Sequence, residues 1–174
     1  MSGPVYLDTS ALVRRAEAAV LQPTPRNIHS GTPVTTLLTS PPVPVATCEV
    51  GLLEFHDVVT MLWRDSNPPY QQHDEAWAES AISQVMADIA QERLSIRAAP
   101  ARAYEQAITL VTMTTRMHGR KFRVWDAVHL VTATAWASEL GQSVELWTTD
   151  GDFDGFVALY PHFGQFVSIK NLDN

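Results

Sequence analysis

The stretch VYLDTSALV, residues 5–13, joins a short apolar run to a helical pattern through a single carboxylate. Val5 to Leu7 predict a strand, and the apolar positions from Ser10 to about Val20 recur at helical spacing. Asp8 therefore stands at the carboxyl end of the predicted strand. One interpretation is a helix cap, because an Asp at that position accepts hydrogen bonds from the free N–H groups of the first turn.

Composition limits the kinds of protein that this chain is compatible with. Its 174 residues, 45% of them hydrophobic, suit one globular domain over residues 1–174. The formal net charge of −7 argues against a protein that grips nucleic acid over its whole surface, although a local basic patch is compatible with it. The one cysteine, Cys48, cannot form an internal disulfide, which fits a reducing compartment. With no signal-peptide pattern and no run approaching about 18 apolar residues, we expect a cytoplasmic protein with no membrane segment.

Predicted strands and helices alternate along the chain. Helical spacing is found at 48–64, 74–93, 101–118 and 125–140, and short strands are predicted at 94–97, 144–147 and 166–169. This alternation predicts an α/β fold with a central, mostly parallel sheet and helices on both faces. Residues 22–44 hold six of the eleven prolines. They predict a loop or insertion, or a short interrupted helix near Val34 to Thr39.

Four acidic residues fall where such a fold places a ligand site. Asp8 and Asp150 each follow a strand, and ligands of open parallel sheets gather at the carboxyl ends of the strands. Glu54 falls on the apolar stripe of its helix, and Asp126 opens the helix that ends near residue 140. Each acid also has a structural interpretation: a helix cap for Asp126, a turn for Asp150 and an ion pair for Glu54.

Converging carboxylates repel one another. Two of them about 4 Å apart, at an effective dielectric constant of about 20, repel by about 4 kcal/mol. The cluster therefore needs protons, arginines or a cation. Because the candidate ligands are all oxygens, Mg²⁺ or Mn²⁺ is the expected ion. A competing interpretation is a calcium loop at DGDFDG, residues 150–155, but its twelfth position is Pro161, where an EF-hand needs a bidentate Glu.

Hydroxyl and basic side chains flank these acids. Ser10 and Thr149 are candidates to hydrogen-bond the carboxylates or a phosphate, with local capping as the alternative. The stretch RMHGRKFRVWD, residues 116–126, is a candidate for binding a nucleic-acid backbone or else a solvated loop. Its basic residues are Arg116, Arg120, Lys121 and Arg123. His129 is predicted to be a hydrogen-bonded structural histidine rather than a ligand.

The stretches YLDTSALV, TCEVGLLEF, WDAVHLVTATA and TTDGDFDGF, in this order, resemble the PIN-domain family, especially the VapC-type toxin ribonucleases. The resemblance implies a three-layer α/β/α fold whose acidic pocket binds one or two Mg²⁺ or Mn²⁺ ions. It also implies RNA cleavage by a metal-activated water, leaving a 5′-phosphate and a 3′-hydroxyl. The implied catalytic residues and metal ligands are Asp8, Glu54, Asp126 and Asp150, with Asp154 as an additional carboxylate and Ser10 as the accompanying hydroxyl.

The resemblance further implies a cognate antitoxin and a homodimer. Two departures bear on substrate choice and partner docking: Cys48 stands where the family often has a serine, and the proline-rich stretch is longer than in the compact toxins. Two alternatives stay open. One is a catalytically silent PIN module that binds RNA or protein. The other is a metal-dependent phosphatase with Asp8 as nucleophile, although Ser10 stands where phosphatases of that pattern usually have a second Asp.

Overall fold

A single five-stranded sheet forms the centre of the molecule. The computed structural model describes residues 3–20, 23–65, 73–118 and 122–174. The strand order is β3-β2-β1-β4-β5, and each neighbouring pair of these strands is parallel. The predicted mostly parallel α/β fold is therefore confirmed. The strands are β1 (Val5–Leu7), β2 (Val45–Cys48), β3 (Ser95–Arg97), β4 (Val144–Thr148) and β5 (Val167–Asn171).

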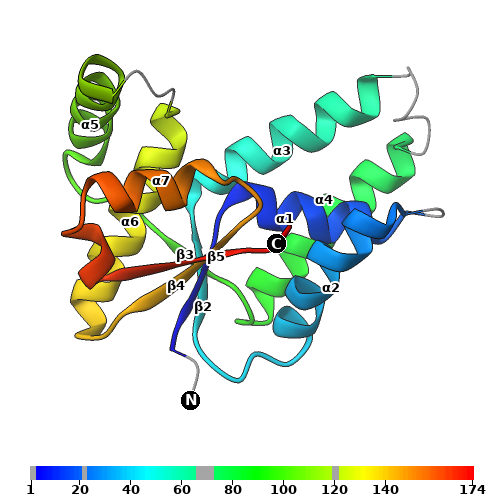
Figure 1. Cartoon of the computed structure of the whole chain (residues 1–174). Coiled ribbons are helices and arrows are strands. Elements are labelled where there is room, and N and C mark those ends of the chain that lie inside the picture. Colours follow the sequence, from blue (N-terminus) through cyan, green and yellow to red (C-terminus); the bar gives the residue numbers. More distant parts are fainter. Residues whose placement is uncertain (1–2, 21–22, 66–72, 119–121) are drawn as a thin grey trace.

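Helices cover both faces of the sheet, giving three layers (Figure 1). Alternate residues of β1 point to opposite faces, so that Val5 and Leu7 join one core while Tyr6 joins the other. The first layer contains α1 (Thr9–Ala18), α2 (Pro25–Thr39), α3 (Glu49–Arg64) and α4 (Glu75–Ala90). The second contains α5 (Ala103–His118), α6 (Val124–Leu140), α7 (Asp152–Leu159) and the short turn η2 (Phe163–Gln165).

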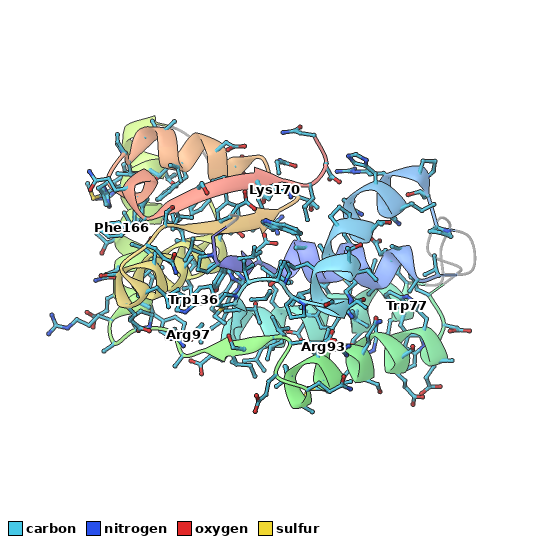
Figure 2. All side chains as sticks on the ribbon, turned by 90° about the horizontal axis from the view of Figure 1, so that it is seen from below. Trp77, Arg93, Arg97, Trp136, Phe166 and Lys170 are labelled. Carbon is cyan, nitrogen blue, oxygen red and sulfur yellow. The ribbon has the colours of Figure 1, made fainter. Side chains whose placement is uncertain are left out.

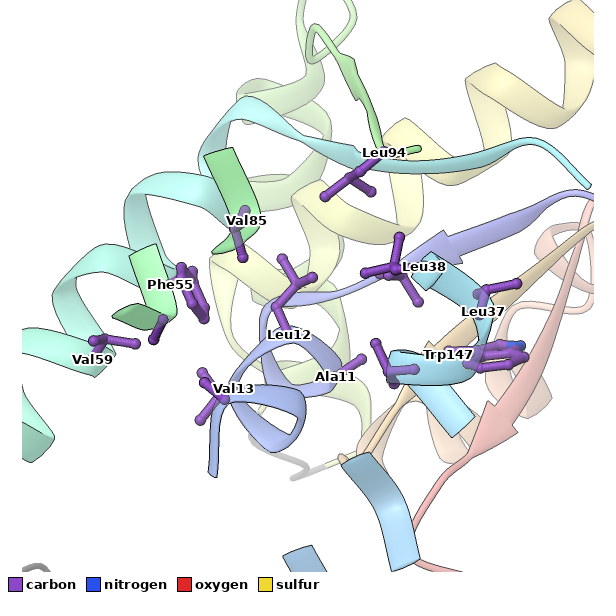
Figure 3. Close-up of a cluster of buried hydrophobic side chains, with 14 of the residues drawn as sticks. Ala11, Leu12, Val13, Leu37, Leu38, Phe55, Val59, Val85, Leu94 and Trp147 are labelled. Atoms are coloured by element: carbon purple, nitrogen blue, oxygen red, sulfur yellow. The ribbon is translucent and has the colours of Figure 1, made fainter. Parts of the chain in front are cut away.

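Two hydrophobic cores hold these layers to the sheet. In the first, side chains from α1, α2, α3 and α4 interlock, among them Leu12, Leu38, Phe55 and Val85 (Figure 3). The second is rich in aromatic rings, and Phe122 stacks on Phe156 with ring centroids 4.2 Å apart. Because both cores are closely packed, the loops between them are carried on a fixed scaffold.

The loop predicted for residues 22–44 is wrong over most of its length. Residues 25–39 form α2, which Thr24 caps by accepting a hydrogen bond from the Asn27 backbone N–H at 3.1 Å. Pro25 occupies the first turn, where a missing N–H costs nothing, and Pro33 is tolerated inside the helix. Gly31 lets α2 lie against α1, because an added Cβ would collide with the Arg14 carbonyl oxygen. The predicted short helix at 34–39 lies within α2.

Cation–π contacts tie both edges of the sheet to neighbouring side chains. The Arg97 guanidinium at the β3 edge lies over the Trp136 ring of α6, 5.8 Å from its centroid (Figure 2). At the other edge, Lys170 Nζ lies 3.8 Å from the Trp147 ring centroid. Such charged edge residues also oppose pairing with further strands. Among the described residues, no helix has the length and apolar character that a membrane span requires.

The strand order fixes where a ligand site can form. From β1 the chain proceeds to β2 and β3 on one side, and β4 and β5 then extend the sheet on the other. β1 and β4 lie side by side with Leu7 opposite Trp147. The carboxyl ends of this pair mark the point at which the winding reverses, where open parallel sheets bind their ligands. Asp8 and Asp150 follow these two ends.

Candidate active site

A cleft of about 250 Å³ opens at the carboxyl ends of β1 and β4. It is lined by four predicted acids from four separate segments: the end of β1, helix α3, the first turn of α6 and the loop after β4. These acids are Asp8, Glu54, Asp126 and Asp150. Ser10, Thr149 and Arg123 also line the cleft. Asp154 is exposed on the first turn of α7 and is not among the lining residues.

Asp8 combines the two interpretations that its sequence context allowed. Its Oδ1 accepts the Ala11 backbone N–H at 2.9 Å and thereby caps α1. Its side chain also lines the cleft, where Ser10 Oγ donates to Oδ1 at 2.8 Å and Thr148 Oγ1 donates to Oδ2 at 2.7 Å. Burial raises the pKa of Asp8, and the nearby His129 and these hydrogen bonds offset only part of that rise.

Asp126 and Asp150 also have structural duties. Asp126 Oδ2 accepts the Arg123 backbone N–H at 3.2 Å in a capping box at the start of α6. Asp150 Oδ1 accepts the Asp152 backbone N–H at 2.9 Å, which closes the turn into α7. Burial, together with smaller contributions from the charges of Asp150, Asp8 and Glu54, raises the pKa of Asp126 to about 7. Asp126 is therefore repelled by the other three acids of the cleft.

The Glu54 carboxylate is held by Thr9 and lies near His129. Thr9 Oγ1 donates to Glu54 Oε2 at 2.6 Å, and His129 Nε2 lies 3.7 Å from the same oxygen. Burial alone would raise the pKa of Glu54, but the nearby His129, the hydrogen bond from Thr9 and the positive charge of Arg123 lower it below its ordinary value. Glu54 therefore contributes a negative charge to the cleft at neutral pH.

His129 lines the cleft with a ring that is almost fully buried. Its ring is 1% exposed, and its Nδ1 lies 3.0 Å from the Tyr6 hydroxyl and 3.6 Å from Cys48 Sγ. Burial alone would lower the pKa of His129, but its contact with Cys48, the nearby Glu54 carboxylate and the other neighbouring negative charges raise it above its ordinary value. The prediction of a hydrogen-bonded, structural histidine agrees with this position.

The hydroxyl that reaches Asp8 from the end of strand β4 belongs to a residue that the sequence did not single out. Thr148 Oγ1 donates to Asp8, whereas Thr149 contributes its backbone N–H to Ser10 Oγ at 2.8 Å. Thr9, also not predicted as a site residue, bonds to Glu54. Thr9 directly follows Asp8, and Thr148 stands two residues before Asp150. This closeness to a predicted acid was the signal in the sequence that could have pointed to them.

The donor chemistry of the cleft fits a hard divalent cation. Its acids supply oxygen ligands of the kind that Mg²⁺ and Mn²⁺ prefer, and their mutual repulsion favours a cation between them. In the described part of the chain, however, no group of three or more His, Cys, Asp or Glu side chains is drawn close enough to hold a metal ion. The carboxylates must therefore move toward one another to coordinate one.

Positive charge near the cleft comes from Arg123. Its exposed side chain stands at the start of α6 and lines the cleft. Arg14 also lines the cleft, but its Nη1 donates to Glu17 at 2.6 Å and to Asn27 at 3.0 Å. Arg116 is exposed on α5. The other two predicted basic residues, Arg120 and Lys121, lie outside the described residues.

Two competing sites are less well supported. The calcium loop considered for residues 150–155 is wrong, because residues 152–159 form helix α7 instead of an open loop. A larger cavity of about 740 Å³ lies between α5, α6 and η2. Its walls are mostly apolar and hydroxyl side chains, with Glu105 as its one carboxylate. It therefore lacks the clustered acids of the smaller cleft.

The solved structures that resemble this chain include a toxin and a member of a toxin-antitoxin family. The sarcin-ricin loop cleaving toxin VapC20 from Mycobacterium tuberculosis has a TM-score of 0.56 at 19% identity, over 87% of this chain and 93% of its own. VapBC-5 from the same organism, of the VapBC family of toxin-antitoxin systems, has a TM-score of 0.53 at 17% identity, over 96% of this chain and 97% of its own. FitAcB from Neisseria gonorrhoeae has a TM-score of 0.55 at 16% identity, over 97% of both chains.

These likenesses extend over nearly the whole chain at low sequence identity. No family model and no curated protein sequence matches the chain. At identities of 16–19% the structural neighbours establish the fold. The three-layer fold that the resemblance to VapC-type PIN domains implied is thus confirmed.

Proposed function

We propose that the chain is a divalent-cation-dependent endoribonuclease, a hydrolase of RNA phosphodiester bonds, and the toxin of a toxin–antitoxin pair. The observation that carries the proposal is the convergence of Asp8, Glu54, Asp126 and Asp150 on one cleft. These acids come from four separate segments of the chain, and burial, together with the charges of the other three acids, raises the pKa of Asp126 to about 7. Such a costly arrangement of charge is typical of functional sites.

The proposed ligands of one or two Mg²⁺ or Mn²⁺ ions are these four acids, with Asp154 as an outer candidate. When bound, the ion would supply an activated water and neutralise charge on the scissile phosphate. The chain's own side chains prepare the ligands. Ser10 and Thr148 fix the orientation of the Asp8 carboxylate, and Thr9 does the same for Glu54. The proposed products are a 5′-phosphate and a 3′-hydroxyl.

Substrate binding would depend on local positive charge. The net charge of −7 disfavours broad contact with RNA, so that Arg123 at the cleft is the principal proposed phosphate contact. Arg116 on α5, Arg120 and Lys121 would extend this contact. A protein with such a small basic surface is expected to select a narrow RNA target. RNA is available in the cytoplasm, where the free Cys48 would also stay reduced.

The proposed partners follow from the fold. VapBC-5 is a member of a toxin-antitoxin family, and the FitAcB and VapC20 structures share the same architecture. We therefore propose a cognate antitoxin that covers the acidic cleft, and a homodimer of this chain. An antitoxin segment bearing an arginine would complement the negative charge of the cleft.

The phosphatase alternative receives less support than the ribonuclease. Phosphatases of that pattern usually have a second Asp two positions after the nucleophile, and this chain has Ser10 there. Asp8 Oδ1 and Oδ2 accept hydrogen bonds from Ala11, Ser10 and Thr148. The alternative of a catalytically silent module keeps the same fold and differs from the proposal in activity alone.

The test is cleavage of a mixed pool of ribosomal, transfer and messenger RNA by the purified chain. Reactions with Mn²⁺ or Mg²⁺ are compared with reactions in EDTA, and the product ends are mapped. Asp150→Asn removes one proposed ligand, while Asp57→Asn is a matched control at a side chain that is 88% exposed on α3. We expect cation-dependent cuts with 5′-phosphates from the wild type and Asp57→Asn, and at least about 100-fold slower cleavage by Asp150→Asn.

The outcomes separate the candidate functions. Cleavage that continues in EDTA, or that Asp150→Asn leaves unchanged, contradicts the proposed cation site. Absence of cleavage by folded, cation-bound protein across the whole pool supports the silent module instead. Borohydride trapping of a covalent aspartyl-phosphate at Asp8 would support the phosphatase.

A further inference from the structure

A chain of hydrogen bonds runs from the centre of the sheet to one acid of the cleft. The Tyr6 hydroxyl lies 3.0 Å from His129 Nδ1, and His129 Nε2 lies 3.1 Å from Thr9 Oγ1. Thr9 Oγ1 in turn lies 2.6 Å from Glu54 Oε2. Tyr6, His129 and Thr9 are all buried, at 0%, 1% and 6% exposure. These hydrogen bonds therefore connect β1, α6, α1 and α3, and each side chain before Glu54 is buried.

The donors and acceptors of this chain have a defined direction. Thr9 has one hydroxyl proton, and the nearest acceptor is the Glu54 carboxylate at 2.6 Å, compared with 3.3 Å for the Gly51 carbonyl. With that proton given to Glu54, the Thr9 oxygen can only accept from His129, so Nε2 must carry hydrogen. Nδ1 then accepts from the Tyr6 hydroxyl when the ring is neutral, and donates when the ring is charged. In both states the link from His129 to Glu54 is the same.

The position of the His129 ring is built into helix α3. An added Cβ at residue 51 would lie 2.6 Å from His129 Cε1 and 3.0 Å from Thr47 Oγ1. Gly51 is thus required for the ring to occupy this space, although glycine inside a helix is less favourable than alanine. Cys48, one turn earlier, accepts the Gly51 backbone N–H at 3.2 Å and faces the same ring.

The hydrogen bond from Thr9 occupies one Glu54 oxygen and leaves the other available. Oε2 accepts from Thr9, and among the described residues no donor reaches Oε1. The Glu54 side chain is 24% exposed at the cleft. A carboxylate with one oxygen fixed and the other directed to a ligand is the arrangement that second-sphere hydrogen bonds produce around metal ions.

We propose that Thr9 and His129 are positioning residues that fix the rotamer of Glu54 and present its free oxygen to the cation. This inference rests on the proposed function, since it assigns Glu54 as a ligand. Thr9 acts by its hydrogen bond to the carboxylate. His129 acts by holding the Thr9 hydroxyl, while Tyr6 and the space at Gly51 hold His129. None of the three side chains is itself proposed to touch substrate.

Mn²⁺ binding measured by calorimetry tests the role of Thr9. Thr9→Val removes the hydroxyl at almost constant volume and is expected to lower Mn²⁺ affinity by about 10- to 100-fold, whereas Thr9→Ser is expected to restore it. Thr132→Val is the matched control, because Thr132 is 1% exposed and its hydroxyl has no partner among the described residues. Thr132→Val should bind Mn²⁺ as the wild type does.

A double-mutant cycle distinguishes positioning from general structural damage. If Thr9 acts through Glu54, Thr9→Val adds no further loss of Mn²⁺ affinity in a Glu54→Gln background. Equal losses in both backgrounds, or an unchanged affinity in Thr9→Val alone, would overturn the proposal. Thermal unfolding of each variant checks that the compared proteins are folded.

A metal-free measurement keeps this inference separate from the proposed function. Long-range ¹H–¹⁵N spectra of the wild type report which imidazole nitrogens of His129 carry hydrogen. We expect hydrogen on Nε2, and a spectrum with Nε2 unprotonated would overturn the chain of bonds. If the wild type binds no Mn²⁺, the proposed cation site fails and, with it, the role given to Thr9, even where the spectrum shows the expected Nε2–H.

Discussion

Asp126 shows how one residue can carry two roles that oppose each other energetically. Its Oδ2 caps α6 by accepting the Arg123 backbone N–H, which favours the ionised form. Burial and the charges of three neighbouring acids oppose ionisation and raise its pKa to about 7. The carboxyl is therefore partly protonated at neutral pH until a cation neutralises the cleft. Asp8 and Asp150 have the same combination of a structural hydrogen bond and a place in the cleft.

The raised pKa of Asp126 predicts how stability depends on pH in EDTA. The folded state retains this proton up to about pH 7, while the unfolded chain releases it near 3.8, so folding stability falls as the pH rises through that window. The loss has an upper limit of about 4 kcal/mol. Asp126→Asn should remove most of this fall and be more stable than the wild type at about pH 8, as measured by urea unfolding. A wild type that gains stability over the same window, with Asp57→Asn behaving alike, would contradict the prediction.

Gly51 provides a second test at the residue scale. In an ordinary helix interior, replacing glycine by alanine stabilises by about 0.5–1 kcal/mol. Here the added Cβ would lie 2.6 Å from His129 Cε1, so that Gly51→Ala should destabilise by about 1–3 kcal/mol. Gly151→Ala is the control, because its Cβ would meet only Asn171 Nδ2 at 4.0 Å. A rise in Tm for Gly51→Ala would show that the ring is free to move.

The acids of the cleft were predictable from sequence, but two of the hydroxyls that support them were not. Asp8 and Asp150 follow strands, and Glu54 interrupts an apolar stripe, so each stands out against its neighbours. The roles of Thr9 and Thr148 arise only when α3, β1 and β4 approach one another, because their partners are distant in the sequence. Threonines beside a turn otherwise suggest local caps.

At the scale of the elements, a buried ion cluster ties α1 to α4. Asp88 on α4 is fully buried and pairs with Arg15 of α1, which is 4% exposed. Arg93, just after α4, donates to the same carboxylate at 2.7 Å. Asp8 caps α1, so this cluster helps to fix the helix whose first residues, Thr9 and Ser10, line the cleft. A buried pair of this kind contributes chiefly to the specific placement of its helices.

Removing one side of this cluster should be costly. Asp88→Asn leaves the buried Arg15 guanidinium without its counter-charge, and we expect a loss of about 3–5 kcal/mol in the free energy of unfolding. Chemical denaturation of the variant, beside Asp57→Asn at an 88% exposed position, measures this loss. A loss below about 0.5 kcal/mol, the range of ordinary surface changes, would show that Arg15 finds water or another partner.

Strongly periodic elements were predicted closely, whereas elements defined by packing were missed. The helices that became α3, α4, α5 and α6 each began and ended within about three residues of their predicted bounds. α2 was hidden by the prolines of residues 22–44, although Pro25 stands at its start and tertiary contacts tolerate Pro33. β2 has only four residues, all buried, so no alternation marks it. α7 begins at an Asp-Gly pair that indicates a turn.

For the whole molecule, fold and activity rest on different kinds of evidence. Parallel pairing and two packed cores define a scaffold shared with solved structures at 16–19% identity. Activity depends instead on a few charges in one cleft, in a chain whose net charge is −7. A protein of this fold whose acids bind no cation would have the same ribbon as one whose acids bind it (Figure 1). Cation binding is therefore the property that separates them.

The most direct measurement is a calorimetric titration of the wild-type chain with Mn²⁺ at about pH 7.5, beside Asp126→Asn and Asp57→Asn. We expect one or two Mn²⁺ ions bound per chain, with proton release from Asp126, and an affinity that is lost in Asp126→Asn but retained in Asp57→Asn. Equal binding by all three proteins, or no binding by the folded wild type, would contradict the claim that these carboxylates form a cation site.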